Sequence, residues 1–270
     1  MLTHLSGLSP RRRLLVLGAL ALAAVLVTAV VARVALGRDD DGGGPPARQD
    51  RPGPVLLVPG YGGGTGGLVE LADRLRSVGR PAEVVVMPSG GTGDLREQAK
   101  ALDRRVALEL REGAPSVDVV GYSAGGVVAR LWAREHGGAR KARRVVTLGS
   151  PHAGAEVAAA GSALAPTACP TACRQLAPGS PLLRDLGARA PVPPVWVSLW
   201  TTHDETVRPE SSRLAGALNI GLQEVCRDAA TTHGGLPTDP VVAGIVLRSL
   251  GADPPAAPGP ADCHTLRTAS

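Results

Sequence analysis

Short apolar runs that alternate with helical patterns constrain the fold of this 270-residue chain most strongly. Runs that are apolar throughout, rather than alternately apolar and polar, are typical of strands buried on both faces. Separated by helices, they predict an α/β domain with a mostly parallel sheet of about six strands and helices on both faces. The expected strands are residues 55–58, 84–86, 117–121, 145–148, 195–200 and 217–225. The expected helices are residues 67–78, 94–112, 124–136 and 238–249.

A basic and apolar N-terminal segment precedes this pattern. Three consecutive arginines, residues 11–13, stand before residues 14–32, which carry no charged side chain. As a helix this run would reach roughly 28 Å, close to the ~30 Å hydrocarbon core of a bilayer. The arginines predict a cytoplasmic N-terminus and an extracytoplasmic body. Residues 1–37 are therefore expected to be an uncleaved signal-anchor, with the body membrane-anchored, or a cleaved signal peptide, with the body secreted.

The charge distribution excludes one class of partner. The N-terminal 38 residues carry five arginines and no acid, which accounts for the whole net charge of +5. The rest of the chain is formally neutral and lacks the basic surface of a nucleic-acid-binding protein. Residues 38–53 are charged and rich in Gly and Pro, which predicts a flexible linker. Residues 54–270 then form one folded domain, expected to be monomeric.

Four cysteines, an even number, agree with an exported protein. Cys169 and Cys173 are close together, whereas Cys226 and Cys263 stand farther apart near the C-terminus. Local pairing would give Cys169–Cys173 and Cys226–Cys263, one of three possible connectivities. The chain has no C-x-x-C pair, so a zinc site is the poorer interpretation. We expect neither a metal nor a cofactor.

The segment Gly121-Tyr122-Ser123-Ala124-Gly125 lies between an expected strand and an expected helix. G-x-S-x-G in this context predicts a nucleophile elbow, in which a strained turn presents the serine. Gly121 and Gly125 are needed because a side chain at either position would collide with the neighbouring strand and helix. The alternative is an ordinary glycine-rich turn. The helix that follows Ser123 directs its positive end at the site, where an oxyanion would develop.

An acyl-transfer serine needs an acid and a base, which follow it in the order Ser, Asp, His in this kind of sheet. Asp204 comes just after the fifth expected strand, at the edge where parallel sheets build their sites. Glu205 is the alternative acid. His233 stands in a Gly-flanked loop before the last helix and is the expected base. His152 precedes Asp204 in the chain, so we expect it at the rim of the site or behind it.

An oxyanion hole requires two backbone N–H donors. One is expected from Ala124, directly after the nucleophile, and the other from Tyr61 in the glycine-rich loop at 59–64. The G-x-G-x-x-G pattern at 62–67 also matches a dinucleotide-binding loop. That function requires an acid at the end of the next strand to bind the ribose. Residues 84–90 contain none, which disfavours nucleotide binding.

With these residues in place, the chain resembles the secreted bacterial lipases of the small α/β-hydrolase type, often called class 2 lipases. The resemblance implies an α/β-hydrolase fold and hydrolysis of acylglycerols or similar lipid esters, with Ser123, Asp204 and His233 as the catalytic residues. One departure is Pro59-Gly60, where the family commonly has His-Gly. The matching segments are VLLVPGYGG (55–63), VDVVGYSAGG (117–126), VVTLGSPHAG (145–154), HDETVRP (203–209) and HGGLPTDPVV (233–242).

These features favour a serine carboxylic ester hydrolase, a lipase or esterase, that acts through an acyl-enzyme. An exported acyltransferase with the same triad is the second hypothesis. A non-catalytic, membrane-tethered binding domain is the third, disfavoured by the intact set of catalytic residues. Residues 154–181 interrupt the strand–helix alternation beside Ser123 and predict a minimal cap pinned by its own disulfide, unless the segment is merely a structural loop. Such a cap predicts activity on dissolved short- to medium-chain esters.

Overall fold

The computed structural model describes residues 45–165 and 167–269, together with Arg11, Gly18, Ala19, Ala21, Ala23, Val25, Val27 and Thr28. Within these parts of the chain, no helix combines the length and the hydropathy needed to cross a membrane. Most of the apolar run at 14–32 lies outside the described residues, so the expected signal or anchor stays a prediction. The chain divides into two compact units, Met1–Gly43 and Gly44–Ser270, and the second carries the fold.

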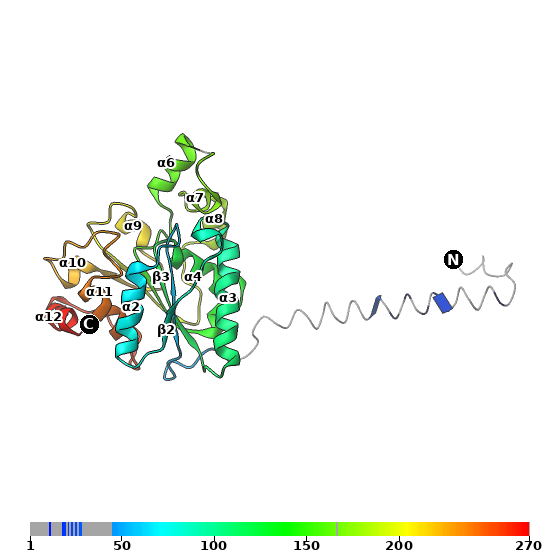
Figure 1. Ribbon diagram of the computed structural model, residues 1–270, viewed down its shortest axis with the longest axis horizontal. Coiled ribbons are helices and arrows are strands. Elements are labelled where there is room, and N and C mark those ends of the chain that lie inside the picture. The colour runs from blue at the N-terminus through cyan, green and yellow to red at the C-terminus, as the bar shows by residue number, and fades with distance from the viewer. Residues whose placement is uncertain are drawn as a thin grey trace. The chain divides into compact units, whose positions relative to one another are not determined.

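A six-stranded sheet forms the centre of the second unit (Figure 1). Its order is β2-β1-β3-β4-β5-β6, and every neighbouring pair is parallel. The predicted α/β architecture is confirmed. The strands are β1 (Val55–Val58), β2 (Ala82–Val84), β3 (Val117–Tyr122), β4 (Ala142–Leu148), β5 (Val195–Trp200) and β6 (Leu218–Gly221).

Four longer helices cover the two faces of the sheet. They are α2 (Gly66–Ser77), α3 (Leu95–Arg111), α4 (Ala124–Glu135) and α11 (Pro240–Ser249). Figure 1 shows α2 and α11 on one side and α3 and α4 on the other. Two apolar cores result, one between the sheet and α3 and α4, the other between the sheet and α2 and α11. All-apolar strands are the consequence of this burial on both faces.

Local sequence explains where two of these helices begin. Asp94 precedes α3, and its carboxylate accepts the backbone N–H of Arg96 at 2.8 Å. Asp239 precedes α11 and accepts the N–H groups of Val241 and Val242. Aspartate at this position satisfies amides that have no partner within the helix. The shorter helices are α5 (Gly138–Lys141), α6 (Glu156–Leu164), α7 (Thr171–Gln175), α8 (Pro181–Leu186), α9 (Pro209–Ser212), α10 (Leu222–Val225) and α12 (Cys263–Thr268).

Some boundaries differ from the sequence-based expectation. β2 occupies residues 82–84 rather than 84–86, because this edge strand pairs with β1 alone and Val86 beyond it is 86% exposed. The sixth strand ends at Gly221, where the chain turns into α10, instead of running to residue 225. Residues 154–181, expected to interrupt the strand–helix alternation, contain α6 and α7. Alanine-rich α6 has no polar–apolar alternation that would have marked it as an amphipathic helix.

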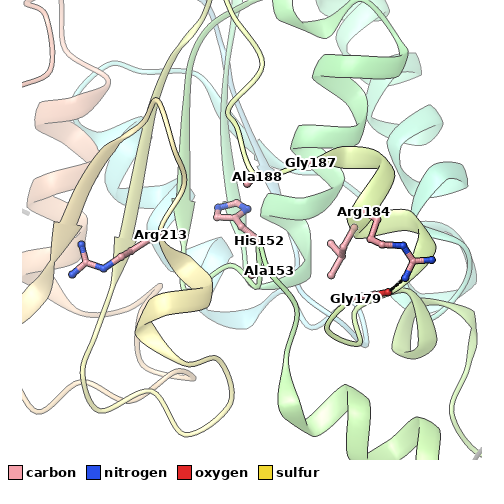
Figure 2. Close-up of a pocket in the computed structure, with 8 residues that line it drawn as sticks. His152, Ala153, Gly179, Arg184, Gly187, Ala188 and Arg213 are labelled. Carbon is pink, nitrogen blue, oxygen red and sulfur yellow. Dashed lines mark hydrogen bonds between the residues drawn. The ribbon is translucent and has the colours of Figure 1, made fainter.

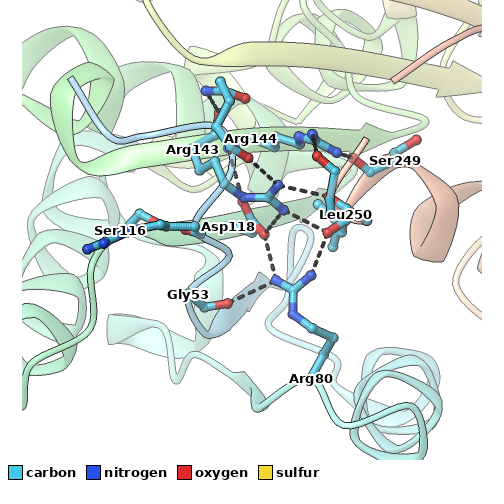
Figure 3. Close-up of polar contacts among 12 residues, drawn as sticks. Gly53, Arg80, Ser116, Asp118, Arg143, Arg144, Ser249 and Leu250 are labelled. Atoms are coloured by element: carbon cyan, nitrogen blue, oxygen red, sulfur yellow. Dashed lines mark hydrogen bonds and ion pairs between the residues drawn. The ribbon is translucent and has the colours of Figure 1, made fainter. Parts of the chain in front are cut away.

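At the amino edge of the sheet, Asp118 on β3 gathers a cluster of arginines (Figure 3). Its carboxylate binds Arg143 at 2.6 and 3.1 Å and Arg80 at 2.6 Å, and it accepts the backbone N–H of Arg144. Arg80 and Arg143 both also donate to the carbonyl of Leu250, and Arg144 donates to that of Ser249. The cluster therefore ties β3, β4 and the end of α11 together, which lets two arginines begin a buried strand.

Part of the expected linker lies against this edge. Gln49 donates to the carbonyl of Arg143 at 2.9 Å, and Ser116 donates to the carbonyl of Arg51 at 2.8 Å. These contacts fall within residues 38–53. The chain is thus held to the domain before β1 begins.

Both disulfides that local pairing suggests are present, Cys169–Cys173 and Cys226–Cys263. The first closes a turn that leads into the beginning of α7, and the second joins the residue after α10 to the first residue of α12. In the described part of the chain, Cys226, Asp228 and Cys263 are the one group close enough to ligate a metal. Its two sulfurs are bonded to each other, so it offers no thiolate.

Candidate active site

Ser123 lies between β3 and α4 in a strained turn. Its φ of 51° and ψ of −122° place a non-glycine residue in a rarely populated backbone conformation. A Cβ at Gly121 would lie 2.6 Å from the backbone of Gly126, and one at Gly125 would lie 2.2 Å from the carbonyl oxygen of Val58. Both glycines are therefore required by close backbone approach, as the elbow pattern predicts.

The structure brings Ser123, His233 and Asp204 together from three separate loops. His233 Nε2 lies 3.0 Å from Ser123 Oγ, and His233 Nδ1 lies 2.7 Å from Asp204 Oδ2. Both are hydrogen-bond distances, and together they connect a hydroxyl, an imidazole and a carboxylate in the order expected of nucleophile, base and acid. His233 stands 29 positions after Asp204 and 110 positions after Ser123 in the chain. The structure thus brings the three side chains together, and their catalytic roles stay a prediction.

The carboxylate of Asp204 is fully buried and fixed from two sides. Besides His233, it accepts the backbone N–H groups of Thr206 at 2.9 Å and Val207 at 2.6 Å through Oδ1. These amides lock the rotamer and leave Oδ2 for the imidazole.

The main chain of His233 is held by two side chains that sequence reasoning did not assign to this task. Glu205 accepts its backbone N–H at 3.1 Å, and the hydroxyl of Tyr122 donates to its carbonyl at 3.2 Å. The Tyr122 ring centroid lies 5.2 Å from that of the imidazole. Burial, and then the charges of Asp204 and Glu205, raise the pKa of Tyr122 to about 12. Its hydroxyl therefore stays protonated and able to donate.

Glu205 and Tyr122 adjoin Asp204 and Ser123 in the chain, and this adjacency is the signal that could have found them. Glu205 was considered only as a substitute acid. The structure instead gives Asp204 the contact with the ring and Glu205 the contact with the main chain. One loop thus contributes two carboxylates with different partners.

The two expected oxyanion donors flank the serine. Ala124 is the first residue of α4, where a backbone N–H has no intrahelical acceptor. Tyr61 follows Gly60, and a Cβ at Gly60 would lie 3.1 Å from Ser123 Cβ, so the loop after β1 passes directly beside the serine. Tyr61 also lines the cavity that contains Ser123. Tyr61 and Ala124 therefore both lie near Ser123, and their role as oxyanion donors stays a prediction.

A mainly apolar cavity of about 180 Å³ opens beside Ser123. One wall comes from the loop after β4 and from α6, and the other comes from the loop after Asp204. Cys173 and Leu176 close it from the α7 side, so the segment at 154–181 does form part of the site. The lining residues are Tyr61, Ser123, Pro151, Ala155, Val157, Ala158, Cys173, Leu176, Thr206 and Val207.

His152 lies away from the three central side chains and has a structural hydrogen bond. Ser198 donates its hydroxyl proton to the carbonyl of Ser212, and Thr147 donates to Ser198. Thr147 must then accept from His152 Nε2, which lies 3.1 Å away, so His152 carries its proton on Nε2. Burial, with Arg130 nearby, holds the pKa of His152 well below its usual range. It is therefore a neutral core histidine.

A second pocket, of about 280 Å³, lies over His152 (Figure 2). Two arginines line it, Arg184 of α8 and Arg213 directly after α9, and Arg213 stacks on the ring of Trp200 at 4.6 Å. It shares no lining residue with the cavity at Ser123. His152, expected at the rim of the site or behind it, thus lines this second pocket.

Comparison with known proteins places these features in context. A family model described as palmitoyl protein thioesterase matches residues 54–183, just under half of the chain. No curated protein matches.

Solved structures that resemble the chain include lipase B of Aspergillus fumigatus, at 20% identity and a TM-score of 0.66, which covers 80% of this chain and 56% of that one. A lipase of Bacillus licheniformis in its mature form has 18% identity and a TM-score of 0.55, covering 66% and 86%. Phospholipase PlaB from Legionella pneumophila has 16% identity and a TM-score of 0.53, covering 79% and 62%. The chain spans just over half the length of the fungal lipase. These likenesses show that the fold is the α/β-hydrolase fold.

Proposed function

We propose that this chain is a serine carboxylic ester hydrolase of the lipase or esterase type. The observation that carries the proposal is the continuous contact from Ser123 Oγ through His233 to the buried carboxylate of Asp204, at 3.0 and 2.7 Å. The strained elbow that presents Ser123 supports it, since such strain persists where a reaction needs it. The lipase neighbours and the thioesterase family model agree with acyl transfer from a lipid.

In the proposed reaction, Ser123 Oγ attacks the acyl carbonyl while His233 Nε2 takes the hydroxyl proton. The backbone amides of Tyr61 and Ala124 bind the oxygen of the tetrahedral intermediate. His233 then gives its proton to the departing alcohol, which leaves an acyl-enzyme on Ser123. A water molecule, deprotonated by His233, attacks this ester. The bond from the acyl carbon to Ser123 Oγ breaks, His233 returns its proton to Oγ, and the acid is released. Asp204 stabilises the imidazolium that forms in each half of the cycle.

The size of the cavity favours short and medium acyl chains. A cavity of roughly 150 Å³ holds one benzene ring. The cavity of about 180 Å³ beside Ser123 therefore encloses roughly six to eight acyl carbons. Longer chains would extend past α6 into solvent or lipid, with less burial per carbon. We expect hydrolysis of long-chain esters to be slower but measurable.

An acyl thioester is the second candidate substrate, favoured by the palmitoyl protein thioesterase model over residues 54–183. The same serine, base and oxyanion donors serve either leaving group. Comparison of kcat/KM for p-nitrophenyl octanoate and for octanoyl coenzyme A separates ester from thioester preference. A ratio above about ten in either direction assigns the preference.

A series of p-nitrophenyl esters from acetate to palmitate tests the main proposal. We expect kcat/KM to peak at medium chain length and to fall by palmitate, with no hydrolysis by Ser123→Ala. Dissolved tributyrin should be hydrolysed below its solubility limit, because Ser123 is partly exposed. Activity that begins only when an emulsion forms would contradict an open site. Product analysis in the presence of alcohols distinguishes hydrolysis from acyl transfer.

Export of the domain is also proposed. The two disulfides and the arginines before the apolar N-terminal run support it. Protein from the native host, alkylated without reduction, should carry no label on its four cysteines. Four labelled cysteines would contradict both the disulfides and the compartment.

A further inference from the structure

The structure has a second strained turn besides the one that presents Ser123. In the described part of the chain, Ser89 and Ser123 are the two residues other than glycine with a positive φ, 52° and 51°. Gly90 and Gly91 follow Ser89 with φ of 56° and 70°. The left-handed conformation is unfavourable for serine, and strain of this kind gathers at functional sites. The segment Pro88–Gly91, which we name the supporting turn, is therefore a candidate for a functional role.

The supporting turn packs against residues 60–63, which we name the oxyanion turn because they include Tyr61. The N–H of Gly63 donates to the carbonyl of Gly60 at 3.1 Å and closes this turn. Gly62, at the third position, has a φ of 83°, as a type II turn requires there. The N–H of Tyr61, at the second position, takes no part in closing such a turn. The closing hydrogen bond therefore sets the direction of the amide that we propose as an oxyanion donor.

Gly91 lies directly against the hydrogen bond that closes the oxyanion turn. A Cβ at Gly91 would lie 2.7 Å from the nitrogen of Gly63 and 3.2 Å from the oxygen of Gly60, the donor and the acceptor of that bond. From the opposite side of the contact, a Cβ at Gly63 would lie 3.0 Å from the oxygen of Gly90. Gly91 is buried, whereas Gly90 is exposed, and a Cβ at Gly90 would meet nothing within 4 Å. The contact therefore requires glycine at position 91, while position 90 has room for a side chain.

The supporting turn is itself held by neighbouring residues. The carbonyl of Ser89 accepts the N–H of Thr92 at 3.1 Å and the hydroxyl of Thr92 at 2.8 Å. The carbonyl of Thr92 accepts the N–H of Ala172, in α7, at 3.1 Å. The side chain of Gln175, also in α7, accepts the N–H of Leu95 at 2.8 Å. These bonds fix the supporting turn, so that it can keep the oxyanion turn in position.

We propose that Gly91 is a positioning residue for the oxyanion hole. Its lack of a side chain lets the supporting turn pack on the oxyanion turn and align the N–H of Tyr61 with the oxygen that becomes negative. This proposal rests on the proposed function. The path to the reacting centre is short, because a Cβ at Gly60 would lie 3.1 Å from Ser123 Cβ. A displaced donor stabilises the oxyanion less well but leaves the binding of the uncharged ester unchanged.

Two neighbouring glycines provide a variant and its matched control. Gly91→Ala should lower kcat for dissolved p-nitrophenyl butyrate by at least about tenfold and leave KM within about twofold, because the oxyanion forms only in the transition state. Loss of a whole oxyanion donor costs about 10²–10³ in kcat, which sets the upper limit. Gly90→Ala adds the same side chain at another positive φ, but in open space, and its kcat should stay within about twofold of the wild type. Equal losses in the two variants, or no loss in Gly91→Ala, overturn the proposal.

A pair of inhibitors separates oxyanion binding from a change in the acyl cavity. Hexyl trifluoromethyl ketone accepts Ser123 Oγ at its carbonyl carbon while His233 takes the hydroxyl proton, and the carbonyl oxygen becomes an anion that resembles the transition state. Hexyl methyl ketone has the same chain without this activated carbonyl. Gly91→Ala should raise the inhibition constant of the trifluoromethyl ketone by about the factor that it lowers kcat, and leave that of the methyl ketone within about twofold. Equal weakening of both inhibitors would show that the cavity has changed instead, and would overturn the proposal.

The outcomes separate this inference from the proposed function. Wild-type protein that hydrolyses no dissolved ester refutes the proposed function and this inference with it. Wild-type protein that hydrolyses the ester, with equal kcat for Gly91→Ala and Gly90→Ala, refutes the role of Gly91 alone. If Gly91→Ala does not fold, Gly63→Ala tests the same contact from the oxyanion turn. It should also lower kcat at least about tenfold with KM unchanged, and an unchanged kcat would contradict the inference.

Discussion

The two ends of the sheet each bury one carboxylate, and the partners of these carboxylates differ. Asp118, at the amino edge, contacts the guanidinium groups of Arg80 and Arg143, and its side chain is fully buried (Figure 3). Asp204, at the carboxyl edge, is equally buried and contacts the imidazole of His233. Arginine is always charged, whereas histidine gains and loses a proton near neutral pH.

This difference separates a structural ion pair from a reactive one. At the amino edge, permanent cations already neutralise Asp118, and burial followed by the charge of Arg143 lowers the pKa of Arg144 beside them. At the carboxyl edge, the carboxylate faces an imidazole, which in the proposed reaction becomes a cation when it takes the proton of Ser123. In the proposed mechanism, Asp204 therefore stabilises a positive charge on His233 that forms in the transition state.

The largest effect on kcat is expected from loss of the Ser123 hydroxyl, the proposed nucleophile. Ser123→Ala should reduce kcat for p-nitrophenyl butyrate by roughly 10⁴–10⁶, because no other group at the elbow can form the acyl-enzyme. The melting temperature should stay at or above that of the wild type, since the substitution removes only a hydroxyl from a strained turn. Activity within tenfold of the wild type would remove Ser123 from the mechanism.

Asp204→Asn tests the reactive carboxylate. The amide keeps an acceptor for the N–H groups of Thr206 and Val207 but no longer stabilises a cation on His233. We expect kcat to fall by roughly 10³–10⁴. Glu205→Gln is the matched control, because it removes the neighbouring charge. A small loss of kcat in Asp204→Asn with a large loss in Glu205→Gln would show that Glu205, and not Asp204, is the acid that acts on the imidazole.

Asp118→Asn tests the other end of the comparison. Loss of the carboxylate leaves buried arginines uncompensated, which should lower the free energy of unfolding by about 3–5 kcal/mol. Urea unfolding measures this loss, and kcat per folded molecule should stay within about twofold of the wild type. Asp73→Asn, in an exposed pair with Arg76, is the control and should cost about 0–1 kcal/mol. A large loss of kcat in folded Asp118→Asn would show that the two ends are coupled.

The smallest expected effects concern the main chain of His233. Tyr122→Phe removes the donor to its carbonyl, and Glu205→Gln keeps an acceptor for its N–H. Each should lower kcat by less than about tenfold, in line with the loss of one hydrogen bond or one nearby charge. Glu205→Ala, which removes the acceptor, should be more severe than Glu205→Gln. Equal effects of Ala and Gln would mean that the hydrogen bond contributes nothing.

The same comparison shows which features the sequence could predict. Ser123 and Asp204 follow β3 and β5 within a few residues, so the parallel topology brings them to one edge. His233 lies farther along the chain, beyond α10, and its Gly-flanked loop before α11 was the signal for it. The fold could be predicted from the apolar runs, because strands of a parallel sheet that are buried on both faces are apolar throughout. Arg143 and Arg144 concealed the start of β4, because their burial depends on Asp118 and on carbonyls more than one hundred residues away. Helix α6 was hidden for a different reason, since its alanine-rich sequence lacks the polar–apolar pattern of an amphipathic helix.

Labelling with a fluorophosphonate tests the central claim most directly, because only a serine activated by a neighbouring base reacts with it. Peptide mapping by mass spectrometry should find one adduct, on Ser123, in the wild type and in Asp118→Asn. The adduct should be lost in His233→Ala. An adduct on another serine, or one on Ser123 that persists unchanged in His233→Ala, would contradict the account.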